Sequence, residues 1–448
     1  MKRLFYLLNL QVSGIKNIEH ALVFDFYKKT INNNFSPEDY KLKAIYGENG
    51  SGKTGIVAGV NLIKRLILNN NYLSDNATQK YLFELVNKKT KHGSVEIEFY
   101  TRVGNENVIL RYCIEFGIRD DYRFYLISER LDSKNGNYSK NQYENVFYVN
   151  NGELIKLNAG NEEFEFFKKA SLNLLEQQTF VASFHSIKNL FPTKSMAGCY
   201  SDILLLVLFS LNLNTYLDET DDHTSYFLQE ELKNYGKDKL NIQKEFELFQ
   251  NIKNKILAIN ANERNVLKSM FTGYEKYVNR LLLFVKIFKP DLCDIEIDKK
   301  DYNESFYQCN LKMVYKDYKL DLEFESRGIK KIVQIFNYLD AASSGEIVFI
   351  HELDSNINDV YLDKLIEYFA IYGKGQLCFT AHNLSPMSVL KKYKNSICFI
   401  SSVNTVHSWA KHGNQNPENA YRNGFIEDSP FNVDSSDFLG ILGEGTDE

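Results

Sequence analysis

Prolines, cysteines and long hydrophobic runs are scarce in this sequence. Six prolines occur among 448 residues, while 29 tyrosines and 32 phenylalanines leave little room for long disordered segments. No apolar run approaches the ~18–20 residues that a membrane-spanning helix needs. The apolar run near the amino terminus is interrupted by Asn9 and Gln11 and precedes no small-residue cleavage site, so we expect a strand there instead of a signal peptide. These absences predict a cytoplasmic protein that does not enter a membrane.

The cysteine spacing and the charge balance limit the possible functions further. The six cysteines, at positions 113, 199, 293, 309, 378 and 398, form no CxxC pair, which argues against a zinc or redox site and favours free thiols in a reducing compartment. The net charge is −5 and the pI about 6.0, so no overall basic field indicates nucleic-acid binding. Lysine and arginine still total 53, which leaves a local basic patch and DNA as a partner open.

The strongest motif is a glycine-rich segment between a predicted strand, 43–46, and a predicted helix, 56–68. Its residues are Gly47, Glu48, Asn49, Gly50, Ser51, Gly52, Lys53 and Thr54. In this setting, backbone N–H groups and the positive end of the helix bind phosphate. Lys53 then reaches the β- and γ-phosphates, and the Thr54 hydroxyl coordinates Mg²⁺. The segment therefore predicts a site for ATP and Mg²⁺, with a plain strand-to-helix turn as the alternative.

A second motif lies far downstream, where an apolar strand ends in an acid. Residues 347–350 are apolar and are followed by His351, Glu352 and, two positions later, Asp354. Such a strand carries a carboxylate toward the attacking water and the metal of a nucleotide site. Many buried strands end in acids, so this segment alone has a purely structural alternative. Together with the glycine loop it predicts that Glu352 is catalytic.

Two further segments carry groups that suit a γ-phosphate. Ser326 and Gly328 stand at the start of a predicted helix, 327–340, where free N–H groups form an anion site; an ordinary Ser326 N-cap is the alternative. His382 follows a predicted strand, 375–380, and a histidine there can hydrogen-bond the γ-phosphate and sense its departure. The alternative is that His382 only has its hydrogen-bonding groups satisfied by the protein at the strand end. The order of the motifs favours function in both cases.

The predicted elements indicate an α/β fold in three parts. Residues 1–199 combine two strands (4–12 and 20–27), the glycine loop, an antiparallel β-layer (94–101, 107–117 and 122–128) and helical residues 161–190. Asn135-Gly136 and Asn151-Gly152 mark hairpin turns. Residues 200–300 predict a helical, coiled-coil-like insertion. Residues 301–448 return to strands and then alternate helices (327–340, 359–371, 384–392) with strands (346–351, 375–380, 396–401), a pattern typical of a parallel sheet, before an acidic tail.

Segments 47–54, 325–331, 347–354 and 379–383 resemble those of ABC-type ATPases, specifically the SMC-like or OLD-like ATPases of bacterial phage-defence systems such as the PARIS and Septu types. The resemblance covers the two ends of the chain. It implies an ABC-type P-loop ATPase head, in which a parallel sheet and an antiparallel β-layer hold an inserted helical subdomain. Two copies would enclose two nucleotides, each glycine loop facing Ser326 and Gly328 of the other copy. The resemblance makes Glu352 the general base, His382 a switch histidine and Asp354 a residue of the dimer interface.

His351 departs from that family's pattern, which has an aspartate holding Mg²⁺ through water directly before the catalytic glutamate. A neutral imidazole can accept a hydrogen bond from metal-bound water but supplies no negative charge. We therefore expect slow turnover or a changed metal preference. Gln177 and Gln178 are candidates for a glutamine loop by residue type alone.

Three functions remain open. In the first, ATP-driven dimerisation or higher homo-oligomerisation controls a separate effector, a nuclease by expectation, when a phage-encoded trigger is sensed. The second is a DNA-repair ATPase similar to RecF, and the third is a nucleotide-held scaffold with little hydrolysis. We favour the first because the motifs make up a complete ATPase and no second catalytic module is visible. Residues 200–300 would then carry the surface for the partner or trigger.

Overall fold

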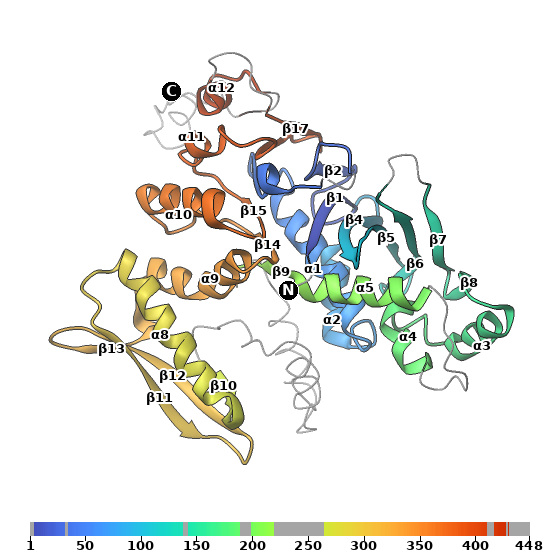
Figure 1. The fold of residues 1–448 in the computed structure, drawn as a ribbon, viewed down its shortest axis with the longest axis horizontal. Coiled ribbons are helices and arrows are strands. Elements are labelled where there is room, and N and C mark those ends of the chain that lie inside the picture. Colours follow the sequence, from blue (N-terminus) through green and yellow to red (C-terminus); the bar gives the residue numbers. More distant parts are fainter. Residues whose placement is uncertain are drawn as a thin grey trace, which may run out of the picture.

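The computed structural model describes residues 4–31, 35–137, 142–188, 199–218, 264–409, 416–426 and 429. These residues form a mixed α/β fold with three sheets and covering helices (Figure 1). The acidic tail and residues 219–263 of the predicted helical insertion lie outside the described residues. In the part of the chain that is described, no helix is both long and apolar enough to span a membrane.

The largest sheet has seven strands in the order β2-β1-β4-β5-β6-β7-β8, all antiparallel. The strands are β1 (Phe5–Ser13), β2 (Leu22–Asp25), β4 (His92–Val103), β5 (Glu106–Ile118), β6 (Phe124–Asn135), β7 (Glu144–Asn150) and β8 (Glu153–Leu157). Asn151 and Gly152 both have positive φ and close the β7–β8 hairpin, as their sequence predicts. The predicted antiparallel layer is thus present, and β6 runs seven residues beyond its expected end at 128.

The central sheet has six strands in the order β17-β16-β3-β15-β14-β9. They are β3 (Leu42–Gly47), β9 (Leu213–Tyr216), β14 (Ile347–Ile350), β15 (Gln376–Thr380), β16 (Ile397–Ile400) and β17 (Val406–Ser408). All pairs are parallel except β16–β17. Every residue of β3, β14, β15 and β16 is buried, as expected for strands covered on both faces. The carboxyl ends of β3, β15 and β14 therefore meet at one edge, with β15 in the middle.

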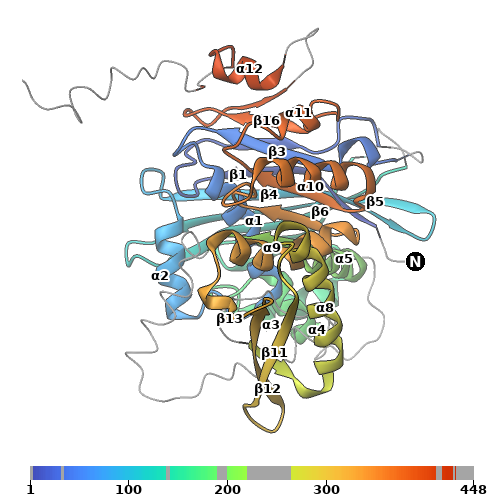
Figure 2. The same cartoon turned by 90° about the vertical axis from the view of Figure 1, so that its left-hand side faces the viewer.

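Helices cover both faces of the central sheet. The helices of the described residues, not all of which touch this sheet, are α1 (Lys53–Leu68), α2 (Asn76–Leu85), α3 (Asn161–Ser171), α4 (Phe180–Lys188), α5 (Cys199–Asn212), α8 (Phe271–Phe288), α9 (Arg327–Ser343), α10 (Asp359–Tyr372), α11 (Met387–Leu390) and α12 (Pro417–Arg422), with 3₁₀ turns η1 (Glu38–Tyr40), η2 (Lys268–Met270) and η3 (Leu322–Phe324). Helix α1 lies between the central and the antiparallel sheets, whereas α9 and α10 lie on the opposite face (Figures 1 and 2). Side chains alternate accordingly, since Phe349 joins the core around α1 while Val348 and Ile350 join the core under α9 and α10.

A small antiparallel sheet packs beside α8. It contains β10 (Arg264–Leu267), β11 (Asp294–Asp301), β12 (Phe306–Val314) and β13 (Lys319–Asp321), in the order β10-β12-β11 with β13 also paired to β12. Arg280 of α8 forms an ion pair with Asp340 of α9, which ties this unit to the central sheet.

The described part of the predicted helical insertion 200–300 contains strands as well as helices. Helices α5 and α8 are present, but β9, β10 and β11 are strands. β9 has four residues and exists because it pairs with the buried strand β14, a partner distant in the sequence. The predicted helix 384–392 is also shorter than expected, since α11 begins after Pro386 and ends at Leu390.

Candidate functional site

The glycine loop joins β3 to α1 at the edge where β3, β15 and β14 end. Gly50 and Gly52 have φ of +84° and +103°, a region that favours glycine, and a Cβ on Gly52 would lie 2.7 Å from Cγ1 of Ile18. The N-cap residue of α1 is Gly52, so no side chain bonds to the first N–H groups of the helix from this position. The first N–H groups of α1 are thus available to an anion, and the helix dipole favours one there.

The side chain of Lys53 bonds to the backbone of the glycine loop. Its Nζ donates to the carbonyl oxygens of Gly47 at 2.7 Å and Glu48 at 2.8 Å. Burial lowers the pKa of Lys53, while the carboxylates of Glu352, Asp354 and Glu48 act in the opposite direction. An incoming phosphate would replace these carbonyls with charged oxygens, which form stronger hydrogen bonds with an ammonium group.

Thr54 and His351 form a direct contact between α1 and the end of β14. Oγ1 of Thr54 and Nε2 of His351 are 2.7 Å apart, and His351 is 2% exposed. The backbone N–H of His351 donates to the Tyr216 carbonyl at 2.9 Å, so the edge strand β9 helps to hold it. The hydroxyl that would coordinate Mg²⁺ is therefore bonded to an imidazole.

Glu352 adopts a backbone conformation that is unusual for its residue type. Its φ is +47°, in the left-handed region, where such residues are held by their surroundings and often serve a function. Thr380 of β15 supplies the restraint, because its Oγ1 accepts from Glu352 N at 2.9 Å and its carbonyl accepts from Leu353 N at 3.1 Å. Oε1 of Glu352 lies 3.4 Å from Nε2 of His382, so the two groups face each other where β14 and β15 end.

Asp354 fixes the loop that carries His382. Its Oδ2 accepts from the backbone N–H groups of His382 at 2.8 Å and Asn383 at 2.6 Å. This pair of bonds joins the segment after β14 to the segment after β15. Asp354 thus positions His382 within its own chain, and contact with nucleotide or a second copy stays a prediction.

These residues surround a cavity of about 320 Å³, here called the nucleotide cavity. Eight of the residues singled out in the sequence line it: Asn49, Gly50, Gly52, Lys53, Thr54, His351, Glu352 and His382. Gly47, Glu48, Ser51 and Asp354 do not line it.

Ser326 and Gly328 are not part of the cavity wall. Ser326 caps α9, since its Oγ accepts from Ile329 N at 3.4 Å, and a Cβ on Gly328 would lie 2.8 Å from the Asn356 carbonyl oxygen. The N-cap alternative is therefore confirmed, and an additional role toward a second copy stays a prediction.

The protein groups fit Mg²⁺ bound together with phosphates better than Mg²⁺ bound alone. Within the described ranges, no group of three or more His, Cys, Asp or Glu side chains is arranged to hold a metal ion. Thr54 offers a hydroxyl and Glu352 a carboxylate on the same cavity wall. Mg²⁺ commonly takes one or two protein ligands and fills its remaining positions with phosphate oxygens and water.

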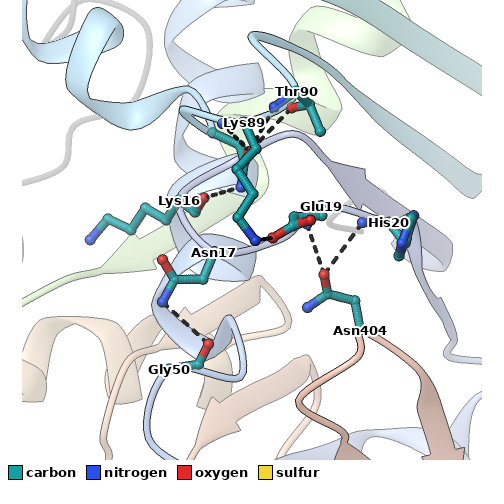
Figure 3. A network of polar contacts seen from close by, with 9 residues as sticks. Lys16, Asn17, Glu19, His20, Gly50, Lys89, Thr90 and Asn404 are labelled. Atoms are coloured by element: carbon teal, nitrogen blue, oxygen red, sulfur yellow. Dashed lines mark hydrogen bonds and ion pairs between the residues drawn. The ribbon is translucent and has the colours of Figure 1, made fainter.

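Six residues of the cavity were missed in the sequence: Gly55, Lys16, Asn17, Glu84, Val86 and Lys88. Gly55 belongs to the first turn of α1, and the other five come from the β1–β2 connection and from the end of α2. Asn17 reaches the glycine loop directly, because its Nδ2 donates to the Gly50 carbonyl at 3.2 Å (Figure 3). The sequence carries a local signal for this connection in Gly14 and Asn17, residue types that favour turns, whereas its packing against the glycine loop depends on tertiary contacts.

Two asparagines hold the β1–β2 connection in place through hydrogen bonds to its backbone. Nδ2 of Asn87 donates to the Lys16 carbonyl at 2.7 Å. On the other side, Oδ1 of Asn404 accepts from Glu19 N at 2.8 Å and His20 N at 3.3 Å (Figure 3). The β1–β2 connection, which contributes Lys16 and Asn17 to the cavity, is therefore held by two other segments of the chain.

Gln177 and Gln178 lie near the carboxyl end of α1, whereas the cavity lies at its amino end. The adjacent Thr179 donates from Oγ1 to the Leu66 carbonyl at 2.7 Å, in the last turn of α1. Lys53 starts the same helix, and 13 residues at 1.5 Å each place the two ends about 20 Å apart. Neither glutamine serves as a glutamine loop for this cavity.

Comparison of the chain with models of known protein families gave no match, and a search of curated proteins found no similar sequence. Any function assigned to the cavity has to follow from its own residues.

Proposed function

We propose that this protein is an ATPase of the ABC-type, SMC-like kind that binds ATP with Mg²⁺ in the nucleotide cavity. The observation that carries the proposal is the meeting of three strand ends at one cavity. Lys53 and Thr54 follow β3, His351 and Glu352 follow β14, and His382 follows β15. A phosphate-binding helix end, a carboxylate and an imidazole are the parts that phosphoryl transfer to water requires.

Binding would begin at the start of α1. The β- and γ-phosphates take the place of the Gly47 and Glu48 carbonyls as acceptors for Lys53, and the N–H groups of the loop surround them. Thr54 would hold Mg²⁺, with His351 beside it as an acceptor for metal-bound water, and the metal would neutralise charge on the phosphate oxygens. The remaining wall, with Lys16, Asn17, Glu84 and Lys88, is left for the nucleoside.

Hydrolysis would use the pair Glu352 and His382. Glu352 accepts a proton from water as the water oxygen bonds to the γ-phosphorus, and the bond from that phosphorus to the bridging oxygen breaks to release ADP. His382, 3.4 Å from the carboxylate, can donate to a γ-phosphate oxygen and orient Glu352. His351 adds no negative charge beside Thr54, so we expect slow turnover.

Assembly around nucleotide is part of the proposal. The nucleotide cavity contains no residue of the α9 N-terminus, so a second copy would have to bring Ser326 and Gly328 to the γ-phosphate. We propose a homodimer or higher homo-oligomer whose closure controls a separate effector, a nuclease by expectation, in response to a phage-encoded trigger. Anti-phage defence rests on the motif resemblance alone.

The contact between Thr54 and His351 favours a second candidate, a scaffold that binds ATP and barely hydrolyses it. An imidazole in that place can hydrogen-bond the Thr54 hydroxyl but adds no negative charge beside the metal. Nucleotide would then stabilise the assembled state by mass action.

Phosphate release and light scattering with Mg-ATP separate these functions. We expect Glu352→Gln to lower turnover at least about 100-fold while nucleotide stays bound and oligomers accumulate. Glu367→Gln, which removes a surface carboxylate paired with Lys364, is the matched control and should keep normal turnover. If neither the native chain nor Glu352→Gln releases phosphate, while both still bind ATP and form oligomers, the result would support the scaffold. Undiminished turnover in Glu352→Gln would remove Glu352 as the base.

A further inference from the structure

One part of the nucleotide cavity wall comes from the end of α2 and the residues that follow it. Glu84, Val86 and Lys88 line the cavity there. The proposed phosphate and metal contacts use none of these three side chains. What they recognise in the nucleoside is an inference that rests on the proposed function.

Backbone contacts place this part of the wall next to the first turn of α1. The N–H of Lys16 donates to the Leu85 carbonyl at 2.7 Å, and Ile15 forms an isolated β-bridge with Val86. The carbonyl oxygen of Ile15 in turn lies 3.1 Å from the position that a Cβ on Gly55 would take. The end of α2 therefore lies close to the N–H groups that begin α1.

The order of groups in a nucleotide determines which of them reaches this wall. Lys53 is proposed to hold the β- and γ-phosphates, and Glu352 and His382 act at the γ-phosphate. The α-phosphate is then left for the remaining N–H groups of the first turn of α1, where Gly55 lines the cavity. The ribose is bonded directly to the α-phosphate, whereas the base is one group further away. The ribose is thus the first part of the nucleoside to meet the wall that Glu84 lines.

Glu84 presents its carboxylate to the cavity from a defined position. Its side chain is 56% exposed, and its Oε2 pairs with Nζ of Lys88 at 3.1 Å. That Nζ also donates to the Phe83 carbonyl at 2.7 Å and lies 3.6 Å from the centre of the Phe83 ring. Within the described ranges, Lys88 is the one partner of Glu84. An exposed ion pair is weak, and a carboxylate has about four acceptor sites, so Glu84 can still accept hydrogen bonds from a ligand.

The same wall offers a base little to bind. Among the described residues that line the nucleotide cavity there is no phenylalanine, tyrosine or tryptophan, and Val86 supplies only an aliphatic surface. Proteins that recognise a base commonly stack it on aromatic side chains. The composition of the wall therefore favours the sugar over the base as the group that Glu84 recognises.

We propose that Glu84 binds the ribose hydroxyls, so that the cavity selects ribonucleoside triphosphates over deoxyribonucleoside triphosphates. A carboxylate only accepts hydrogen bonds, and its two oxygens match the neighbouring 2′ and 3′ hydroxyls, which can both donate. Hydrogen bonds to a charged acceptor are stronger than those between neutral groups. A 2′-deoxyribose lacks one of the two donors. Lys88 holds the carboxylate in place for this contact.

The direct test compares ATP with 2′-deoxy-ATP, which differ by one hydroxyl, in calorimetric titrations of the full chain with Mg²⁺. We expect 2′-deoxy-ATP to bind about tenfold more weakly, because one hydrogen bond to a charged but exposed acceptor is lost. GTP keeps the ribose and should bind within about threefold of ATP, since no aromatic ring of the wall stacks on the base.

A variant assigns the preference to Glu84. Glu84→Gln should weaken ATP more than 2′-deoxy-ATP and reduce the preference to below about threefold, because the acceptor loses its charge. A merely structural role of Glu84 would weaken both nucleotides equally. The matched control is Glu19→Gln, since Glu19 also pairs with a lysine, Lys89, but does not line the cavity (Figure 3). This control should keep the full preference for ATP.

The outcomes separate this inference from the proposed function. If the native chain binds 2′-deoxy-ATP as tightly as ATP, the inference is overturned and the ATP site stands. If GTP and its 2′-deoxy form both bind at least about tenfold more tightly than ATP, Glu84 recognises the base and the inference is also overturned. If neither ATP nor 2′-deoxy-ATP binds, the proposed function fails and the inference fails with it.

Discussion

Oγ1 of Thr54 and Nε2 of His351 lie 2.7 Å apart although the residues are 297 positions apart in the sequence. The contact joins the start of α1 to the end of β14 in the interior, where His351 is 2% exposed. It places an imidazole, where a carboxylate would supply negative charge, next to the hydroxyl that is proposed to hold Mg²⁺. The consequence should be visible in the metal dependence of turnover.

We predict that His351→Asp lowers the Mg²⁺ concentration needed for half-maximal phosphate release about tenfold, because a carboxylate adds negative charge beside the metal. His351→Asn is the matched control, as its amide can bond Thr54 without adding charge. An equal gain in His351→Asn would mean that shape, and not charge, limits the native site.

Asp354 is predicted to act through His382. Asp354→Ala leaves the N–H groups of His382 and Asn383 without their acceptor, so we expect kcat to fall about tenfold to 100-fold with KM changed less than threefold. Unfolding stability should fall by about 1–3 kcal/mol. The matched variant is Asp359→Asn, because Asp359 bonds the side chain of Asn383 and leaves the backbone of His382 untouched. A rise in KM with kcat unchanged would show that Asp354 serves nucleotide binding instead.

Glu129 is predicted to make folding stability depend on pH. It accepts from the Tyr112 hydroxyl at 2.9 Å and from Phe180 N at 2.6 Å, the first residue of α4. Burial raises the pKa of Glu129 from 4.5 to about 7 despite these bonds. The folded protein thus holds this proton more tightly than the unfolded chain does. Its contribution is complete below pH 4.5 and is lost as the pH rises to about 7, by about 3 kcal/mol in total.

Thermal unfolding between pH 5 and 8 checks this prediction. Glu129→Gln cannot titrate and should flatten the dependence across that window. Glu115→Gln is the control, because Glu115 is exposed on the neighbouring strand β5 and bonds only Ser128 among the described contacts. A Glu129→Gln variant that keeps the native pH profile would place the titration elsewhere.

The sequence predicted the elements whose signals are local. The buried run 43–46, the glycines after it and the helical spacing beyond them define β3, the loop and α1 without any distant partner. The strands that carry Glu352 and His382 are likewise continuous apolar runs. The sequences of fully buried parallel strands are continuous apolar runs because both faces of each strand are covered.

Elements and contacts that depend on distant partners could not be predicted. The four residues of β9 become a strand by pairing with β14, and the charged strand β11 forms along β12. Lys16 and Glu84 reach the nucleotide cavity only through packing of the β1–β2 connection and α2. The bond from Asp354 to the backbone of His382 likewise needs the two strands to be neighbours.

Calorimetric titration of the purified chain with Mg-ATP tests the central claim most directly. The native protein should bind ATP saturably, and Lys53→Ala should bind it at least about 100-fold more weakly. Arg65→Ala, which removes an exposed cation from the far end of the same helix, should bind as the native chain does. A Lys53→Ala variant that binds Mg-ATP as tightly as the native protein would contradict a phosphate site at the start of α1.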